Sequence, residues 1–328
     1  MSALFYVLAI ALRFKARQQP GRSLEPLCWR WVALPCSGRS NGVQVKGVPL
    51  VLCPPRRLLI FFALTFVWSW TCWLLAPVVQ PASTSAASTL FFLGGFGPSL
   101  AAVVVVGVAN GRAGLRAWLS RCLHWRGQAG WITLAFLSPF AVLALAATLH
   151  MALGGSVPPS PASGHIGMLM GNLFLVFLVG GPPGEEFGWR GYALPAIQQR
   201  LGWRSASLVL GVIWDVWHLP LFFIAGTAQG NGSIPVFFVL IVATSVFYTW
   251  LYQRSAGSVL PVLALHTASN SWPSVIPILP SNADQRPYLF VVGLVVTAAI
   301  WLLVRRDRLP PTPVAVGECT PALWPRNA

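Results

Sequence analysis

The feature that most constrains this chain is a series of long apolar runs, each of about the length that crosses a lipid bilayer as one helix. We expect eight runs, at residues 58–80, 88–109, 131–153, 166–184, 206–226, 234–252, 257–279 and 287–304. Hydrophobic residues make up 55% of the 328 and charged residues only 9%, against roughly a quarter charged in soluble proteins. The sequence therefore predicts an all-α, polytopic membrane protein with about eight transmembrane helices.

The arginines divide the loops between these runs into two sets. The loops at 81–87, 154–165, 227–233 and 280–286 contain one basic residue in total, Arg286. The other loops and the exit of the last run contain Arg112, Arg116, Arg121, Arg126, Arg190, Arg200, Arg204, Arg254, Arg305, Arg306 and Arg308. Cytoplasmic loops are enriched in Lys and Arg. We therefore expect the basic loops and both termini in the cytoplasm, with the protein in the plasma membrane.

The charge and the apolar runs together define three regions. We expect residues 1–57 to be a poorly ordered basic extension, 58–304 the membrane domain, and 305–328 a disordered tail. Four arginines interleaved with apolar residues predict an amphipathic helix on the cytoplasmic surface at 111–126. The net charge of +15 comes from short basic clusters, not from a stripe on a soluble domain, so we expect membrane lipids and no nucleic acid as partners.

Two adjacent carboxylates are the most unusual polar residues of the membrane domain. Between residues 57 and 282 the only acidic residues are Glu185, Glu186 and Asp215. A carboxylate in a spanning helix is disfavoured by roughly 2.5 to 3.5 kcal/mol and usually faces a protein interior or a wet cavity. On a helix Glu186 shares a face with Arg190, while Glu185 points about 100° away. We expect Glu186 and Arg190 to form a structural pair, and Glu185 to face a cavity as a general base.

Glycines and prolines at 180–184 come directly before this pair. Proline lacks a backbone donor and glycine is a poor helix former, so we expect this segment to break or kink the fourth run. A break at membrane depth is tolerated where it lines a water-filled cavity. The alternative is that the two glutamates and Arg190 form only a polar rim at the cytoplasmic surface.

Two histidines are predicted to lie inside spans. His218 is in the fifth run, and His266 is in the seventh with Asn270 four residues later on the same face. Histidines in membrane helices often serve only as interhelical hydrogen bonders. Asp215, three residues before His218, could orient that imidazole or instead belong to the cavity wall.

These residues resemble the motifs of the CAAX protease and bacteriocin-processing (CPBP) family, which includes the type II CAAX prenyl endopeptidases. The family pattern is Glu-Glu-x-x-x-Arg, Phe-x-x-x-His and His-x-x-x-Asn on an eight-helix membrane domain. Here the three motifs stand at Glu185–Arg190, Trp214–His218 and His266–Asn270. The first and third match fully, and the second has Trp214 in place of Phe.

The resemblance implies an intramembrane endopeptidase with a cytoplasm-facing polar cavity and a membrane-protein or lipidated-peptide substrate. Glu185 and His218 would activate a water, His266 and Asn270 would stabilise the oxyanion, and Glu186 and Arg190 would support them. We expect no cofactor. The alternative within the family is a zinc held by Glu185, His218 and His266, although the H-E-x-x-H signature is absent.

Three other functions remain open on the sequence. The same scaffold could serve as a non-catalytic binding or bacteriocin-immunity protein, as the family also suggests. A transporter could use Glu185 and the histidines as a proton relay, although we find no internal repeat. His218 and His266 could also ligate a haem.

Overall fold

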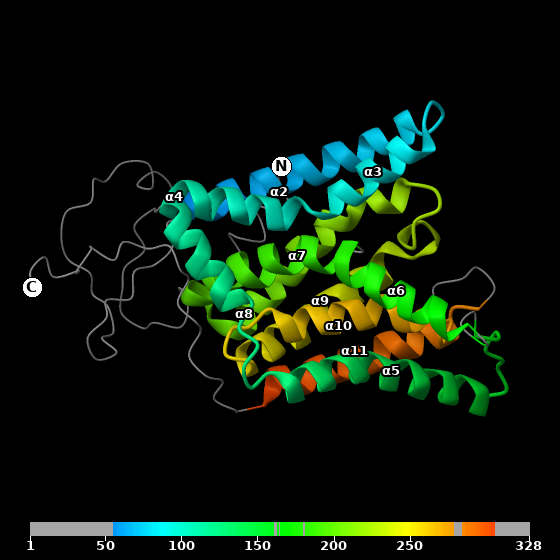
Figure 1. Cartoon of the computed structure of the whole chain (residues 1–328). Coiled ribbons are helices and arrows are strands. Elements are labelled where there is room, and N and C mark those ends of the chain that lie inside the picture. Colours follow the sequence, from blue (N-terminus) through cyan, green and yellow to red (C-terminus); the bar gives the residue numbers. More distant parts are fainter. Residues whose placement is uncertain (1–54, 161–162, 164, 180, 279–283, 306–328) are drawn as a thin grey trace, which may run out of the picture. The chain divides into compact units, whose positions relative to one another are not determined.

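The computed structural model describes residues 55–160, 163, 165–179, 181–278 and 284–305. The described residues form helices and connecting loops and contain no strand, which confirms the all-α class (Figure 1). The expected extension at 1–57 and tail at 305–328 lie outside the described residues, apart from 55–57 and 305.

The helices follow one another with short connections. In order they are α2 (Pro55–Val79), α3 (Thr84–Gly95), α4 (Gly97–Cys122), α5 (Ala129–Ala152), α6 (Ile166–Val179), α7 (Pro182–Gly188), η1 (Trp189–Ala193), α8 (Leu194–His218), η2 (Leu219–Phe223), η3 (Gln229–Asn231), α9 (Ile234–Arg254), α10 (Leu260–Ser271), η4 (Trp272–Ser274) and α11 (Arg286–Val304). The element η1 is a π-helix, and η2 to η4 are 3₁₀-helices.

Six helical stretches in the described part of the chain are long and apolar enough to cross a membrane, which identifies an integral membrane protein. They are Pro55–Val79, Gly97–Cys122, Ala129–Ala152, Leu169–Phe223, Ile234–Arg254 and Arg286–Val304. The stretch Leu169–Phe223 covers most of both the fourth and the fifth expected run. The seventh expected run corresponds to α10, which at 12 residues is too short to span by itself. The count of eight spans stays a prediction.

Hydrogen bonds bring the basic loops together at one end of the helices, called the basic end below. These bonds run from Val259 N to Cys122 O (2.8 Å), from Gln128 Nε2 to Ser255 O (3.1 Å), from Trp118 Nε1 to Gly191 O (3.1 Å) and from Arg204 Nε to Leu303 O (2.7 Å). In Figure 1 the basic end lies at the left, and α5 and α11 run side by side away from it in opposite chain directions.

The expected amphipathic helix at 111–126 continues α4 after a change of direction. Gly111 has a φ of 61°, and the helix resumes beyond it and ends at Cys122. Trp118 is 1% exposed, so this segment packs against the protein through its indole, which donates to Gly191 O. Whether its arginine-bearing face lies on a membrane surface stays a prediction.

Arg286 lies at the other end of the helices, called the opposite end. Its Nε donates to His150 Nδ1 at 3.2 Å, and its Nη2 is 3.8 Å from Asp284 Oδ2. These contacts join the start of α11 to the end of α5. The basic residue that the loop pattern leaves out of place is therefore part of a polar contact between two helices.

Candidate active site

The expected break before the two glutamates is present. Helix α6 ends at Val179, and α7 begins at Pro182 after Gly181, whose φ of 105° suits only glycine. Proline at the first helical position needs no backbone donor there. Glu185 consequently lies in the first turn of a new helix, with Glu186 next to it.

Two glycines let α7 approach the end of α3 and the start of α4 closely. A Cβ on Gly188 would lie 2.3 Å from the carbonyl carbon of Pro98, and one on Gly184 would lie 2.5 Å from Gly95 O. Small residues four apart commonly allow such contacts between membrane helices. Ser99 Oγ adds a hydrogen bond to Pro183 O at 2.7 Å. The backbone that carries the glutamates is thus fixed by direct helix contact.

Glu186 is fully buried and accepts two hydrogen bonds on one oxygen. Arg190 Nη1 donates to its Oε1 at 3.1 Å, and His266 Nδ1 lies 2.8 Å from the same atom. A carboxylate that contacts both a guanidinium and an imidazole fixes the position of both. Glu186 therefore links the first motif of the sequence to the third.

Arg190 is fully buried between two aromatic rings. Its guanidinium carbon lies 4.2 Å from the ring centre of Trp214 and 4.6 Å from that of Tyr248. Aromatic faces attract a cation, more strongly where water is excluded. The pair of Glu186 and Arg190 is thus enclosed by protein and does not form a polar rim at a surface.

Glu185 faces away from this pair. It is 6% exposed, and its Oε2 accepts a hydrogen bond from Trp214 Nε1 at 2.7 Å. The residue that replaces the family's Phe therefore contacts the carboxylate through an N–H group that Phe lacks. This contact fixes the side chain of Glu185 at the edge of a cavity.

His218 lies at the end of α8 and lines the same cavity. Its Nδ1 is 2.7 Å from Trp214 O. A carbonyl oxygen can only accept, so Nδ1 carries the hydrogen. In the neutral imidazole Nε2 is then a hydrogen-bond acceptor. Asp215 does not contact the imidazole: its Oδ1 is buried and has no hydrogen-bond partner among the described residues.

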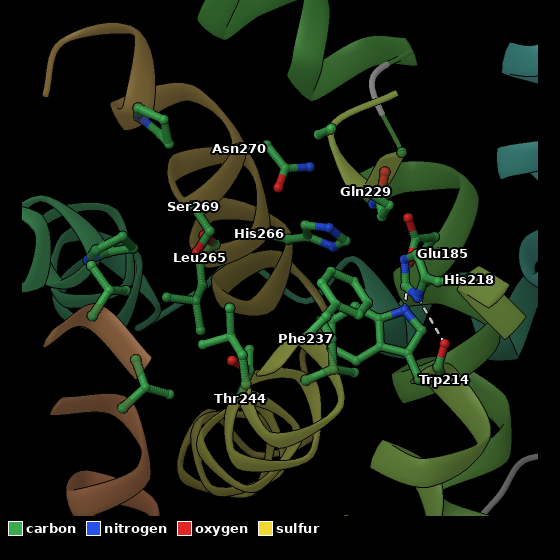
Figure 2. Close-up of a pocket in the computed structure, with 18 of the residues that line it drawn as sticks. Glu185, Trp214, His218, Gln229, Phe237, Thr244, Leu265, His266, Ser269 and Asn270 are labelled. Atoms are coloured by element: carbon green, nitrogen blue, oxygen red, sulfur yellow. Dashed lines mark hydrogen bonds between the residues drawn. The ribbon is translucent and has the colours of Figure 1, made fainter. Parts of the chain in front are cut away.

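The cavity has a volume of about 690 Å³. Glu185, His218, His266 and Asn270 all line it, so the structure brings together the four residues expected to be catalytic (Figure 2). Apolar side chains of α5, α9 and α11 form much of the remaining wall, including Pro139, Val142, Leu240, Ile241, Phe247, Val291, Leu294 and Val295. Polar groups therefore occupy one part of a largely apolar space.

One group of described residues could hold a metal ion: Glu185, Glu186 and His266, whose ligand atoms lie within 4.8 Å of one another. The expected zinc set has His218 in place of Glu186. Glu186 Oε1 and His266 Nδ1 already bond to each other, and Arg190 occupies the same carboxylate oxygen. The donor types suit a divalent cation, but all three residues already bond to protein groups, Glu185 to Trp214 and Glu186 to Arg190 and His266.

Several residues of the cavity were not singled out from the sequence. Tyr248, Ser269 and Gln229 line it, and Tyr248 also contacts Arg190. Tyrosine and serine are common in membrane helices, so nothing local marks them. Gln229 comes from the loop after α8, and only the folded chain brings it to the cavity (Figure 2).

Comparison with known proteins agrees with the three motifs. Residues 167–272 match the family model described as type II CAAX prenyl endopeptidase Rce1-like. A relative named CAAX prenyl protease 2, from Methanococcus maripaludis, is 27% identical over 223 residues, which cover 64% of this chain and 82% of the relative. The matched region contains every residue of the candidate site that lies between Glu185 and Asn270. Through this region the chain is similar to type II CAAX prenyl endopeptidases, and both matches support its membership of the CAAX protease (CPBP) family of membrane proteins.

Proposed function

We propose that this protein is an intramembrane endopeptidase that hydrolyses peptide bonds with a water activated by Glu185. The observation that carries the proposal is the separation of the two carboxylates. Glu186 is bonded to Arg190 and His266, whereas Glu185 faces the cavity. A carboxylate in a cavity with two imidazoles and an amide has the groups that general-base hydrolysis requires.

His218 would assist Glu185 in holding the water. Because its Nδ1 donates to Trp214 O, the Nε2 of the neutral imidazole is an acceptor. A water between Glu185 and His218 could donate one hydrogen to each. That arrangement would direct an oxygen lone pair toward a substrate carbonyl.

His266 and Asn270 would stabilise the oxyanion that forms when the water adds to that carbonyl. Glu186 holds His266 through Nδ1, so a protonated His266 would donate from Nε2. The amide of Asn270, one helical turn further along α10, would be a second donor. Arg190 would support the site from outside by fixing Glu186.

The substrate class follows from the cavity wall and from the family. The polar groups lie beside apolar side chains of α5, α9 and α11. We propose membrane proteins or lipidated peptides as substrates, because an apolar segment or lipid chain would fit this wall. The relative's name refers to prenylated substrates, which belong to this class.

A metal-assisted reaction is the alternative mechanism. If a divalent cation binds, Glu185, Glu186 and His266 would hold it, and the cation would polarise a bound water. We propose the metal-independent route, because Arg190 and His266 already satisfy one oxygen of Glu186. Dialysis of purified protein against a chelator should leave its activity unchanged. Loss of activity on chelation, with recovery on adding zinc, would establish the metal route.

The membrane peptidomes of cells expressing the wild-type protein and Glu185→Gln test the proposal. The substitution keeps the shape of the side chain and removes the base, so cleavage products should fall by about 10² to 10⁴-fold. Asp215→Asn is the matched control, because Asp215 is a buried carboxylate that does not line the cavity. Undiminished cleavage by Glu185→Gln would reject the catalytic role. Absence of cleavage by the wild-type protein, with a stably bound partner, would favour the binding or immunity function.

A further inference from the structure

The segment at 111–126, called the basic segment below, exposes three arginines. Arg112, Arg116 and Arg126 are all exposed, and none of them forms an ion pair with a carboxylate of the described residues. The three acidic residues between positions 57 and 282 are buried elsewhere in the domain. Three positive charges therefore face outward from one short segment, with no acidic side chain of the described chain beside them.

Large apolar side chains are exposed next to these arginines. Leu123 is 44% exposed and Trp125 is 69% exposed. On a helix, Arg112, Arg116 and Leu123 lie within about 40° of one another, so charge and apolar surface share one face. The guanidinium carbon of Arg126 lies 5.9 Å from the ring centre of Trp125. Arginine beside leucine and tryptophan is typical of helices that lie in the headgroup region of a membrane.

The direction of the basic segment suits such a position. The part of α4 before it is apolar and belongs to a stretch long enough to cross a membrane. At Gly111 the φ of 61° interrupts the helix, and the part that follows runs at a steep angle to the first part (Figure 1). The basic segment therefore starts where a membrane helix ends and does not continue along its axis.

The inner face of the basic segment bonds to the turn that carries Arg190. Trp118 Nε1 and Arg121 Nη2 both donate to Gly191 O, each at 3.1 Å. Pro195, four residues after Gly191, has no N–H for the ordinary helical bond to this oxygen. The two side chains of α4 thus supply donors to a carbonyl group directly after Arg190.

The same inner face also contacts α7 and the start of α10. The ring of Trp118 lies 6.2 Å from that of Phe187, which follows the two glutamates in α7. Cys122 O accepts a hydrogen bond of 2.8 Å from Val259 N, at the first turn of the helix that carries His266. The basic segment therefore touches each of the elements that hold the buried carboxylate, the guanidinium and the imidazole.

We propose that the exposed face of the basic segment binds the headgroups of anionic phospholipids, and that bound lipid stabilises the turn that carries Arg190. Guanidinium groups pair well with phosphate, and exposed arginines are attracted to an anionic membrane surface. Leu123 and Trp125 would enter the boundary between headgroups and acyl chains, which a soluble anion does not offer. Lipid binding is independent of the proposed function, because it can be measured without any cleavage.

Thermal unfolding of the full-length protein in an uncharged detergent measures this binding. Phosphatidylglycerol and phosphatidylcholine with the same acyl chains are added in separate titrations. A ligand that binds the folded protein raises its unfolding temperature as the ligand concentration rises. We expect phosphatidylglycerol to raise it by several degrees and phosphatidylcholine to change it little. Equal effects of the two lipids would overturn the proposal.

Soluble anions separate a lipid from the other ligands that arginines bind. Inorganic phosphate and a polyglutamate peptide are added to the same protein at the charge concentration of the phosphatidylglycerol. We expect both to have a much smaller effect, because neither has an acyl chain to cover Leu123 and Trp125. Stabilisation by phosphate or by the peptide as strong as that by the lipid would overturn the assignment to lipid.

Two triple variants at the same positions locate the site. The first combines Arg112→Gln, Arg116→Gln and Arg126→Gln, and the matched control has lysine at the same three positions. All three side chains are exposed, so without lipid both variants should unfold near the wild-type temperature. The glutamine variant should lose at least about tenfold in apparent affinity for phosphatidylglycerol, whereas the lysine variant should keep most of it. Unchanged affinity of the glutamine variant would overturn the proposal.

Hydrogen exchange tests the connection to the turn that carries Arg190. The backbone amides at 189–194 are followed by mass spectrometry with and without phosphatidylglycerol. We expect the lipid to slow their exchange in the wild-type protein. Trp118→Phe keeps the ring but removes one donor to Gly191 O, so it should bind the lipid equally well and show a smaller slowing. No slowing in the wild type, or equal slowing in Trp118→Phe, would overturn this connection.

Discussion

The two halves of the helical domain use the same residue types for different purposes. In the closed half, Glu186 and Arg190 are fully buried, bonded to each other and enclosed by aromatic rings. In the hollow half, Glu185 and His218 each have one protein partner and face open space. The difference teaches that partners on every side hold a buried charge in place, whereas a carboxylate with one partner keeps a side open toward the cavity. Four substitutions test this contrast.

The largest effect should come from the closed half. Glu186→Gln leaves the guanidinium of Arg190 buried without a counter-charge, and breaking a buried pair in this way typically costs about 3 to 5 kcal/mol. Thermal unfolding of the protein in detergent should show a large fall in stability. The double variant Glu186→Leu with Arg190→Leu should regain much of it, because no charge is then stranded. If Glu186→Gln alone were as stable as the wild type, the stability of the closed half would not depend on this buried pair.

The next effect should appear in the hollow half as lost activity with little lost stability. Trp214→Phe keeps an aromatic ring near Arg190 but removes the N–H that holds Glu185. A hydrogen bond to a charged group contributes about 1.5 to 3 kcal/mol, so kcat should fall roughly 10 to 100-fold. The value of KM and the unfolding temperature should change little. Trp203→Phe, which does not line the cavity, is the control. An equal fall in stability would mean that Trp214 acts only through packing.

A smaller effect should follow from disturbing the contact between α4 and α7, which supports both halves. Gly188→Ala would place a Cβ 2.3 Å from the backbone of Pro98, and such overpacking costs about 1 to 3 kcal/mol. Gly107→Ala on α4 is the matched control, since a Cβ there meets nothing within 4 Å. Unfolding in detergent should separate the two variants. Equal stability would show that α7 can shift without cost.

The smallest effect should come from the opposite end. Arg286→Ala removes the contacts with buried His150 and partly exposed Asp284, and because Arg286 is itself partly exposed we expect a loss of about 1 kcal/mol. Thermal unfolding of this variant in detergent should show the small loss. A loss as large as that of Glu186→Gln would show that the contact at the opposite end is as important for stability as the buried pair.

Much of the site is predictable where neighbours in sequence are neighbours in space. A spacing of four residues on one helical face predicts the contact between Glu186 and Arg190, and the structure contains it. The glycines and prolines predict the break before α7, because backbone preference acts locally. The alternative interpretation, a polar rim at the cytoplasmic surface, does not match the structure, since Glu186 and Arg190 are fully buried.

The sequence by itself determined the membrane class, the helical composition and the set of candidate site residues, because hydrophobicity, helix periodicity and side-chain chemistry are local properties. Only the tertiary structure decided the contacts between distant residues. Trp214 bonds to Glu185 across 29 positions and His266 to Glu186 across 80, distances at which no spacing rule applies. The direction in which the cavity extends was likewise decided by packing. It depends on which parts of the helices are filled by large side chains such as Trp118 and Tyr252, and which parts, such as the loop at 226–229, border the cavity.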